Sequence, residues 1–107
     1  MVSVLQQLGP FEELVLLALI RLRDNAYGVT IRQEITKRTS KNVSLGAVYT
    51  TLDRLQGKGY VSSRWGEPTP ERGGRAKRYF VIEAPGRRAL NSTRDVFAKM
   101  SARVAYV

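Results

Sequence analysis

Apolar residues recur along the chain with a helical period near both ends and an alternating period between them. From Phe11 to Leu22 they occupy nearly every direction around a helix, which predicts a buried helix over residues 10–23. A shorter helix is expected over residues 27–38, and a third over residues 44–57. Because the core of so small a chain would cover only one face of the first helix, we expect a second subunit to cover the other.

In the third helix, apolar and polar residues separate onto opposite faces. Four apolar residues fall within one arc and predict the core face: Leu45, Val48, Leu52 and Leu55. The opposite face carries small residues first and longer polar residues later: Gly46, Ala47, Thr50 and Arg54. Tyr49 and Thr51 lie on the flanks of this face, and Ser44 is a suitable N-cap.

Beyond the third helix the period becomes the alternation of β-strands. Residues 60–65 and 77–82 predict two strands, and a loop rich in glycine and proline, residues 66–75, joins them. Ala84-Pro85-Gly86 interrupts the pattern again, and the rest of the chain predicts a helix.

This order of elements predicts a mainly α fold with a two-stranded β-hairpin. The arrangement corresponds to a winged helix-turn-helix over residues 1–83 and a C-terminal dimerisation helix over residues 84–107, which packs with the helix at residues 10–23. In the last helix, apolar residues recur every three or four positions, as in a coiled coil. The expected dimer contacts come from both helices: Phe11, Leu14, Leu16, Ile20, Leu90, Phe97, Met100 and Val104.

The residue inventory narrows the possible chemistry. The 107 residues include no cysteine and no histidine, which excludes disulfides, a Cys/His zinc site and a Ser-His-Asp triad. No set of catalytic base and nucleophile can be assembled, so we expect no enzyme, no metal and no cofactor. The longest apolar run, Leu14 to Ile20, is far shorter than the roughly 20 residues that span a bilayer, and a cytoplasmic protein without a membrane partner is expected.

The charge is concentrated in one part of the chain. The formal net charge is +9, and residues 32–88 carry thirteen basic and five acidic side chains, a net charge of +8. This segment holds the second and third helices and the hairpin, and the excess predicts a polyanionic partner. A simply solvated surface is the alternative interpretation.

The third helix and the hairpin loop together suggest how double-stranded DNA would be bound. Arg54 could pair with guanine, and Thr50 could contact a thymine methyl group or a phosphate, when the helix enters the major groove. Arginines beside glycines in the loop suit a phosphate backbone or a narrow minor groove. The candidate DNA contacts are Lys41, Ser44, Ala47, Tyr49, Thr50, Thr51, Arg54, Arg72, Arg75 and Lys77.

Several ordered motifs resemble the PadR family of bacterial winged-helix regulators. The run from Val48 to Leu55 followed by Gly59-Tyr60-Val61 is similar to the family's recognition helix. The other similar motifs are Tyr27-Gly28, Gly73-Gly74-Arg75 with Lys77-Arg78-Tyr79-Phe80, and Gly86-Arg87-Arg88-Ala89-Leu90. The chain departs from the family at Glu83, where a threonine N-cap is usual, and in its Pro68-Thr69-Pro70 loop.

The resemblance implies a homodimer that binds a pseudo-palindromic operator, usually as a repressor released by a small molecule or a cellular signal. It also implies recognition-helix contacts from Tyr49, Thr50 and Arg54 and hairpin contacts from Arg75 and Lys77. Some family members bind flat aromatic compounds between their subunits. Phe97 would be the corresponding ligand contact, with ordinary core packing as its alternative role. An RNA-binding or protein-interaction module remains the alternative function.

Overall fold

The six elements expected from the sequence are present in the computed structural model, which describes residues 7–68 and 75–105. Within these residues the helices are α1 (Pro10–Leu22), α2 (Gly28–Thr39), α3 (Leu45–Gly57) and α4 (Ala84–Ser101), with a short 3-10 turn, η2 (Arg23–Asn25). The strands β1 (Val61–Trp65) and β2 (Arg78–Ile82) form an antiparallel hairpin. The predicted fold class is confirmed, and the predicted element boundaries are correct to within a few residues, except that the last helix ends at Ser101.

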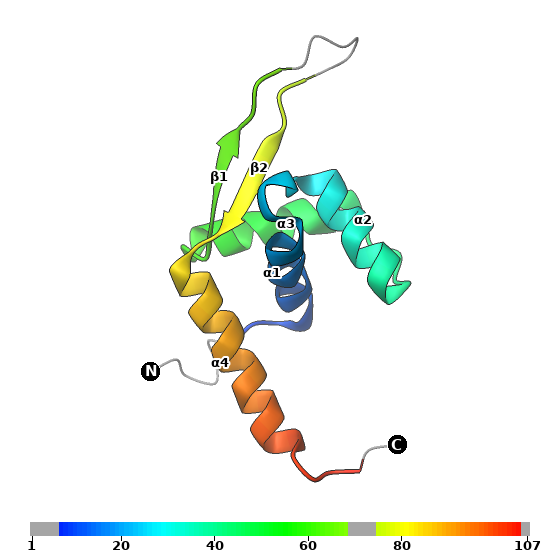
Figure 1. The fold of residues 1–107 in the computed structure, drawn as a ribbon, viewed down its shortest axis with the longest axis vertical. Helices are drawn as coiled ribbons and strands as arrows, with labels where there is room; N and C mark the ends of the chain where they lie inside the picture. Colours follow the sequence, from blue (N-terminus) through cyan, green and yellow to red (C-terminus); the bar gives the residue numbers. More distant parts are fainter. Residues whose placement is uncertain (1–6, 69–74, 106–107) are drawn as a thin grey trace.

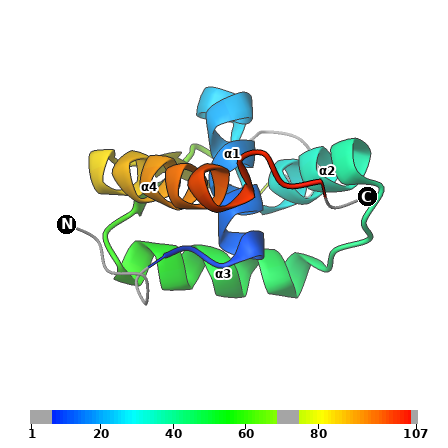
Figure 2. The same ribbon diagram turned by 90° about the horizontal axis from the view of Figure 1, so that it is seen from below.

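Helix α1 lies at the centre of the molecule, with α2, α3, α4 and the hairpin around it (Figures 1 and 2). Val15 and Leu16 are fully buried there, so the chain covers both faces of α1 by itself. The structure therefore differs from the prediction that Leu16 faces a second subunit. Phe11, Leu14 and Ile20, the other predicted contacts on α1, are only partly buried against the core.

Helices α2 and α3 are held close together by a glycine. A Cβ atom on Gly28 would overlap the ring of Tyr49, so α3 approaches α2 at a distance that only glycine permits. At the start of α3, the backbone N–H of Ala47 donates a 3.0 Å hydrogen bond to the Ser44 hydroxyl, which confirms the predicted N-cap. This contact and this cap fix the helix-turn-helix.

The hairpin is attached to the helical core at its base. Val61 pairs with Ile82 and Ser63 with Phe80, and the side chains of Val61, Phe80 and Ile82 are buried. The Phe80 backbone N–H donates a 2.8 Å hydrogen bond to the carbonyl of Ala26, between η2 and α2. The base of the hairpin is thus fixed, whereas its far end extends beyond the helices (Figure 1).

Helix α4 begins against the domain and then leaves it (Figure 1). A Cβ atom on Gly86 would overlap the carbonyl oxygen of Tyr60, which shows how closely the first turn packs. Glu83 does not cap the helix with its side chain; its carboxylate accepts a 2.9 Å hydrogen bond from the Ser62 hydroxyl. Leu90, predicted as a dimer contact, is buried in the protomer's own core, which is a second difference from the prediction.

No helix among the described residues is both long and apolar enough to cross a membrane.

Candidate DNA-binding interface

The outward face of α3 carries most of the side chains expected there. Ala47, Thr50 and Arg54 are exposed, while Val48, Leu52 and Leu55 are fully buried on the opposite side. Thr51 is the exception, because it is only 5% exposed. The prediction that Thr51 contacts DNA is therefore wrong for this conformation, and its side chain belongs to the core.

The first turn of α3 is open to close approach by another surface. Lys41 and Ser44 are exposed just before it, and a Cβ atom added to Gly46 would meet no other atom within 4 Å. Small side chains at this end let the helix backbone come near a surface. A major groove about 12 Å wide accepts a helix of this shape.

Tyr49 has a structural role as well as a candidate binding role. Its ring covers Gly28 of α2, and the residue is still 37% exposed. The ring is therefore held by α2, while part of the side chain lies on the outer face of α3. A tyrosine fixed in this way could donate a hydrogen bond to a phosphate without losing further side-chain freedom.

Arg78 connects the hairpin to α3. Its Nη2 donates a 2.9 Å hydrogen bond to Gln56 Oε1, and its Nε donates a 3.1 Å hydrogen bond to the Ser63 hydroxyl. Its Nη1 lies 3.8 Å from Asp53 Oδ1, and its guanidinium lies 5.0 Å from the centre of the Phe80 ring. These contacts hold the hairpin beside the outer face of α3.

Sequence reasoning missed Arg78 as a positioning residue. The four partners of its guanidinium come from α3, β1 and β2, and only the strand register brings them together. The alternation of side chains along β1 was the sequence feature that could have predicted this role, because it places Ser63 on the side of the hairpin that faces α3.

Exposed basic side chains lie where the hairpin meets the start of α2. Arg75 and Lys77, two of the predicted DNA contacts, are both exposed, and Lys77 Nζ lies 4.8 Å from the centre of the Tyr27 ring. Tyr27 also makes an edge-to-face contact with Tyr79, with the ring centres 5.5 Å apart. Arg72, the remaining predicted contact, lies outside the described residues. Tyr27 is thus a second residue whose part in this surface the sequence did not indicate.

Trp65 adds an aromatic side chain to the opposite face of the hairpin, on which Ser63 and Arg78 lie. It is 70% exposed and follows Ser63 by two positions, so it lies on the strand face that contacts α3. An exposed tryptophan beside a basic hairpin can contact sugars or stack on a base. The alternating pattern of residues 60–65 predicted on which face of the strand Trp65 lies, but it did not predict that the side chain is exposed.

At the other end of α3, one basic residue is neutralised by an ion pair. Lys58 Nζ lies 2.9 Å from the carboxylate of Glu12, which also accepts a 2.9 Å hydrogen bond from the backbone N–H of Gly9. Burial alone would raise the pKa of Glu12, but these two hydrogen bonds and the charges of Lys58 and Arg54 outweigh it and lower that pKa below 4.5. Glu12 is therefore ionised at neutral pH and fastens α1 to the end of α3.

The part of the chain that the structure describes contains no group of three or more His, Cys, Asp or Glu side chains able to hold a metal ion.

Comparison with known proteins gives a consistent result. Residues 16–92 match the family model described as "Transcriptional regulator PadR-like family". A PadR family transcription regulator from Clostridium difficile R20291 aligns with a TM-score of 0.69 and 19% identity, over 87% of this chain and 92% of the other. A PadR-like transcription factor from Bacteroides fragilis aligns with a TM-score of 0.72 and 23% identity, over 85% and 82% of the two chains.

A transcriptional regulator from Clostridium thermocellum aligns with a TM-score of 0.71 and 23% identity, over 84% of each chain. No curated protein matches the sequence. The three structural similarities show that the chain shares the fold of these proteins, and the match over residues 16–92 shows the family to which it belongs.

Proposed function

The chain belongs to the PadR-like family of transcriptional regulators, whose members bind DNA, and from this premise we propose that it is a homodimeric, sequence-specific repressor. In this proposal α3 enters the major groove of a pseudo-palindromic operator and the hairpin follows the adjacent backbone. Thr50 and Arg54 contact base edges, and Ala47 lets the helix backbone approach them. Phosphates are contacted by the other exposed candidates: Lys41, Ser44, Tyr49, Arg75 and Lys77.

The observation that carries the DNA-binding part of this proposal is the contact set of Arg78. A winged helix binds well only if its recognition helix and hairpin meet the same duplex together. Because Arg78 joins Gln56 of α3 to Ser63 of β1, the two basic surfaces stay in a fixed relation before DNA arrives. Little ordering of the protein is then needed on binding, which supports a specific complex.

The homodimer rests on the second half of α4. Phe97 and Met100 are 67% and 77% exposed, and Val96 and Val104 are exposed beside them. Burying one such side chain fully stabilises an assembly by about 2 kcal/mol, and a two-fold dimer buries each of them twice. Phe11, Leu14 and Ile20 of α1, which are only partly buried, would extend this interface.

Release from DNA by a small aromatic molecule follows from the same interface. Two Phe97 rings near the two-fold axis of such a dimer would stack on a flat guest. Phe97 also lines a shallow hollow with Arg94 and Ser101, so the ring is accessible at the protein surface. Titration with aromatic compounds should give binding that Phe97→Ala abolishes; binding that is equal in both proteins would contradict this contact.

A binding selection from random duplex DNA tests the proposed function. We expect an enriched motif with two related half-sites, and an affinity that falls with salt at a slope of about −0.9 per phosphate contacted. Selection without any enriched motif would contradict sequence-specific binding. An RNA duplex of the same sequence serves as the control, because its deep, narrow major groove does not admit side chains, and equal binding to RNA would favour an RNA-binding module instead.

A further inference from the structure

One acidic side chain lies among the candidate DNA contacts of α3. Asp53 follows Gly46 by seven positions and Thr50 by three, so it shares their outward face. Its side chain is 67% exposed, and a Cβ atom added to Gly57, one turn further along, would meet no other atom within 4 Å. Asp53 is the only acidic residue in α3. A surface that attracts phosphates thus carries a carboxylate, which repels them.

An ion pair links Asp53 to Arg78, but it does not satisfy the carboxylate. Arg78 Nη1 lies 3.8 Å from Asp53 Oδ1, which is longer than a hydrogen bond. The Nε and Nη2 atoms of Arg78 are hydrogen-bonded to Ser63 and Gln56 instead. Both oxygens of Asp53 can therefore still accept a hydrogen bond from another molecule.

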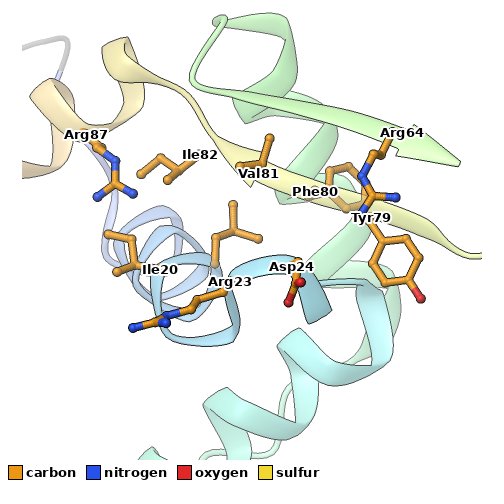
Figure 3. Close-up of a pocket in the computed structure, with 10 residues that line it drawn as sticks. Ile20, Arg23, Asp24, Arg64, Tyr79, Phe80, Val81, Ile82 and Arg87 are labelled. Carbon is orange, nitrogen blue, oxygen red and sulfur yellow. The ribbon is translucent and has the colours of Figure 1, made fainter. Parts of the chain in front are cut away.

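The other arginine of the two strands is turned away from Asp53. Arg64 pairs with Tyr79 in the strand register, on the face of the hairpin opposite to Arg78. Its guanidinium lies 5.0 Å from the centre of the Tyr79 ring, and Figure 3 shows the two side chains next to each other. Strands β1 and β2 therefore supply no second ion pair to Asp53.

The chemistry of the major groove determines what such a carboxylate can contact. A carboxylate accepts hydrogen bonds and donates none, so phosphate oxygens and the acceptor atoms of guanine and thymine repel it. The amino groups of cytosine and adenine are the donors that base edges present in this groove, and the adenine amino group lies beside the acceptor N7. Cytosine is therefore the base that a carboxylate favours.

We propose that Asp53 is a specificity-determining residue, whose carboxylate weakens binding to DNA in general and accepts a hydrogen bond from a cytosine amino group in each operator half-site. This inference rests on the proposed function, in which Thr50 and Arg54 make the other base contacts. Residues 32–88 carry a net charge of +8, which attracts every duplex alike. A carboxylate on the same surface opposes that attraction wherever the facing base lacks an amino group, so it raises the ratio of specific to non-specific affinity.

Fluorescence anisotropy with two duplexes tests this role: the motif that the wild-type protein enriches, and a random sequence of the same length. Asp53→Asn keeps the size of the side chain and removes its charge. Affinity for the random duplex should rise about two- to fivefold, because repulsion of the phosphates is lost. Affinity for the motif should fall about threefold, because a charge-assisted hydrogen bond becomes a neutral one. The ratio of the two affinities then falls roughly tenfold, and a selection repeated with Asp53→Asn should lose the cytosine preference at one position in each half-site.

Two matched variants separate this role from a change in net charge and from a loosened hairpin. Asp24→Asn makes the same charge change at an exposed residue of η2, outside α3, and should leave the affinity ratio unchanged. Gln56→Ala removes the acceptor of Arg78 Nη2 and should weaken both duplexes by a similar factor without changing the motif. If Asp53 acted only through Arg78, Asp53→Asn would reproduce the pattern of Gln56→Ala, and the inference would be overturned.

Failure of this inference and failure of the proposed function give different results. A wild-type protein that enriches no motif overturns the proposed function and this inference with it. A wild-type motif that persists unchanged in Asp53→Asn, whether the two affinities change equally or not at all, overturns this inference alone. The same conclusion follows if Asp24→Asn lowers the affinity ratio as much as Asp53→Asn does.

Discussion

The candidate DNA-binding surface and the second half of α4 are both exposed, but they are built in opposite ways. Around α3 and the hairpin, the exposed residues are polar or basic and are held by other parts of the chain, as Tyr49 is by Gly28 and the hairpin is by Arg78. From residue 94 to residue 100, α4 is exposed on every side and includes large apolar side chains. The first surface is basic and its side chains are held in place, whereas the second is apolar and exposed on the described protomer.

The largest expected effect comes from placing a charge on the apolar side of α4. Met100→Asp should convert a dimer into monomers, because burying an unpaired carboxylate costs several kcal/mol. Sedimentation velocity at micromolar concentration measures the change, and operator affinity should fall more than 100-fold because each monomer then holds one half-site. Lys99→Asp, on the polar side of the helix, is the control and should remain dimeric. A monomeric wild-type protein would contradict this assignment of α4.

The packing of α2 against α3 should be the next most sensitive feature. Gly28→Ala introduces a Cβ atom that overlaps the Tyr49 ring, and overpacking of this kind costs about 1–3 kcal/mol of unfolding free energy. Gly46→Ala adds the same atom to open space inside a helix and should stabilise the protein by up to about 1 kcal/mol. Urea denaturation measures both. Equal effects of the two substitutions would show that the Gly28 contact does not constrain the helices.

Two arginines should affect DNA binding in different ways. Arg54→Ala should cost about 1–3 kcal/mol at the preferred operator and relax the preference at one base position in each half-site. Arg75→Ala should weaken all sequences by a similar factor and reduce the salt slope by about 1. Fluorescence anisotropy on a set of operator variants separates these patterns. Uniform weakening by Arg54→Ala would move Arg54 from the base-contacting group to the phosphate-contacting group.

The smallest expected effect concerns the ion pair between Glu12 and Lys58. Because folding lowers the pKa of Glu12 below its ordinary value of 4.5, this carboxylate stabilises the protein fully above pH 4.5. The contribution is lost as the pH falls through the lower pKa of the folded state. Glu12→Gln should therefore cost about 1 kcal/mol at pH 7 and progressively less in acid, as measured by thermal unfolding between pH 7 and pH 3. A difference that stays constant across this range would contradict the pair.

The sequence predicted the elements well, because the helical and alternating periods are long and distinct. It placed the cap at Ser44 and the exposed side of α3 correctly, since both depend on neighbours within one or two turns. Thr51 was misplaced because α3 packs against α1, α2 and β1, which widens its buried face beyond the apolar arc. The position of a residue at the edge of that arc depends on tertiary packing.

The two differences in the predicted dimer contacts have a similar origin. Leu16 was assigned to a partner on the argument that so small a core covers only one face of α1, but three helices and the hairpin surround that helix. The apolar repeat of α4 is continuous in sequence, yet Leu90 packs inside the domain and Phe97 lies beyond it. No property of the repeat itself marks where the domain ends.

The contact between Gly86 and the Tyr60 carbonyl has a consequence for the operator. It fixes the angle at which α4 leaves the domain, and in a two-fold dimer joined through α4 that angle sets the distance between the two copies of α3. Successive major grooves on one side of B-DNA are about 34 Å apart, so a small change in angle would mismatch one of the half-sites. In the proposed dimer, the spacing between operator half-sites would therefore depend on a glycine that is buried inside its own protomer.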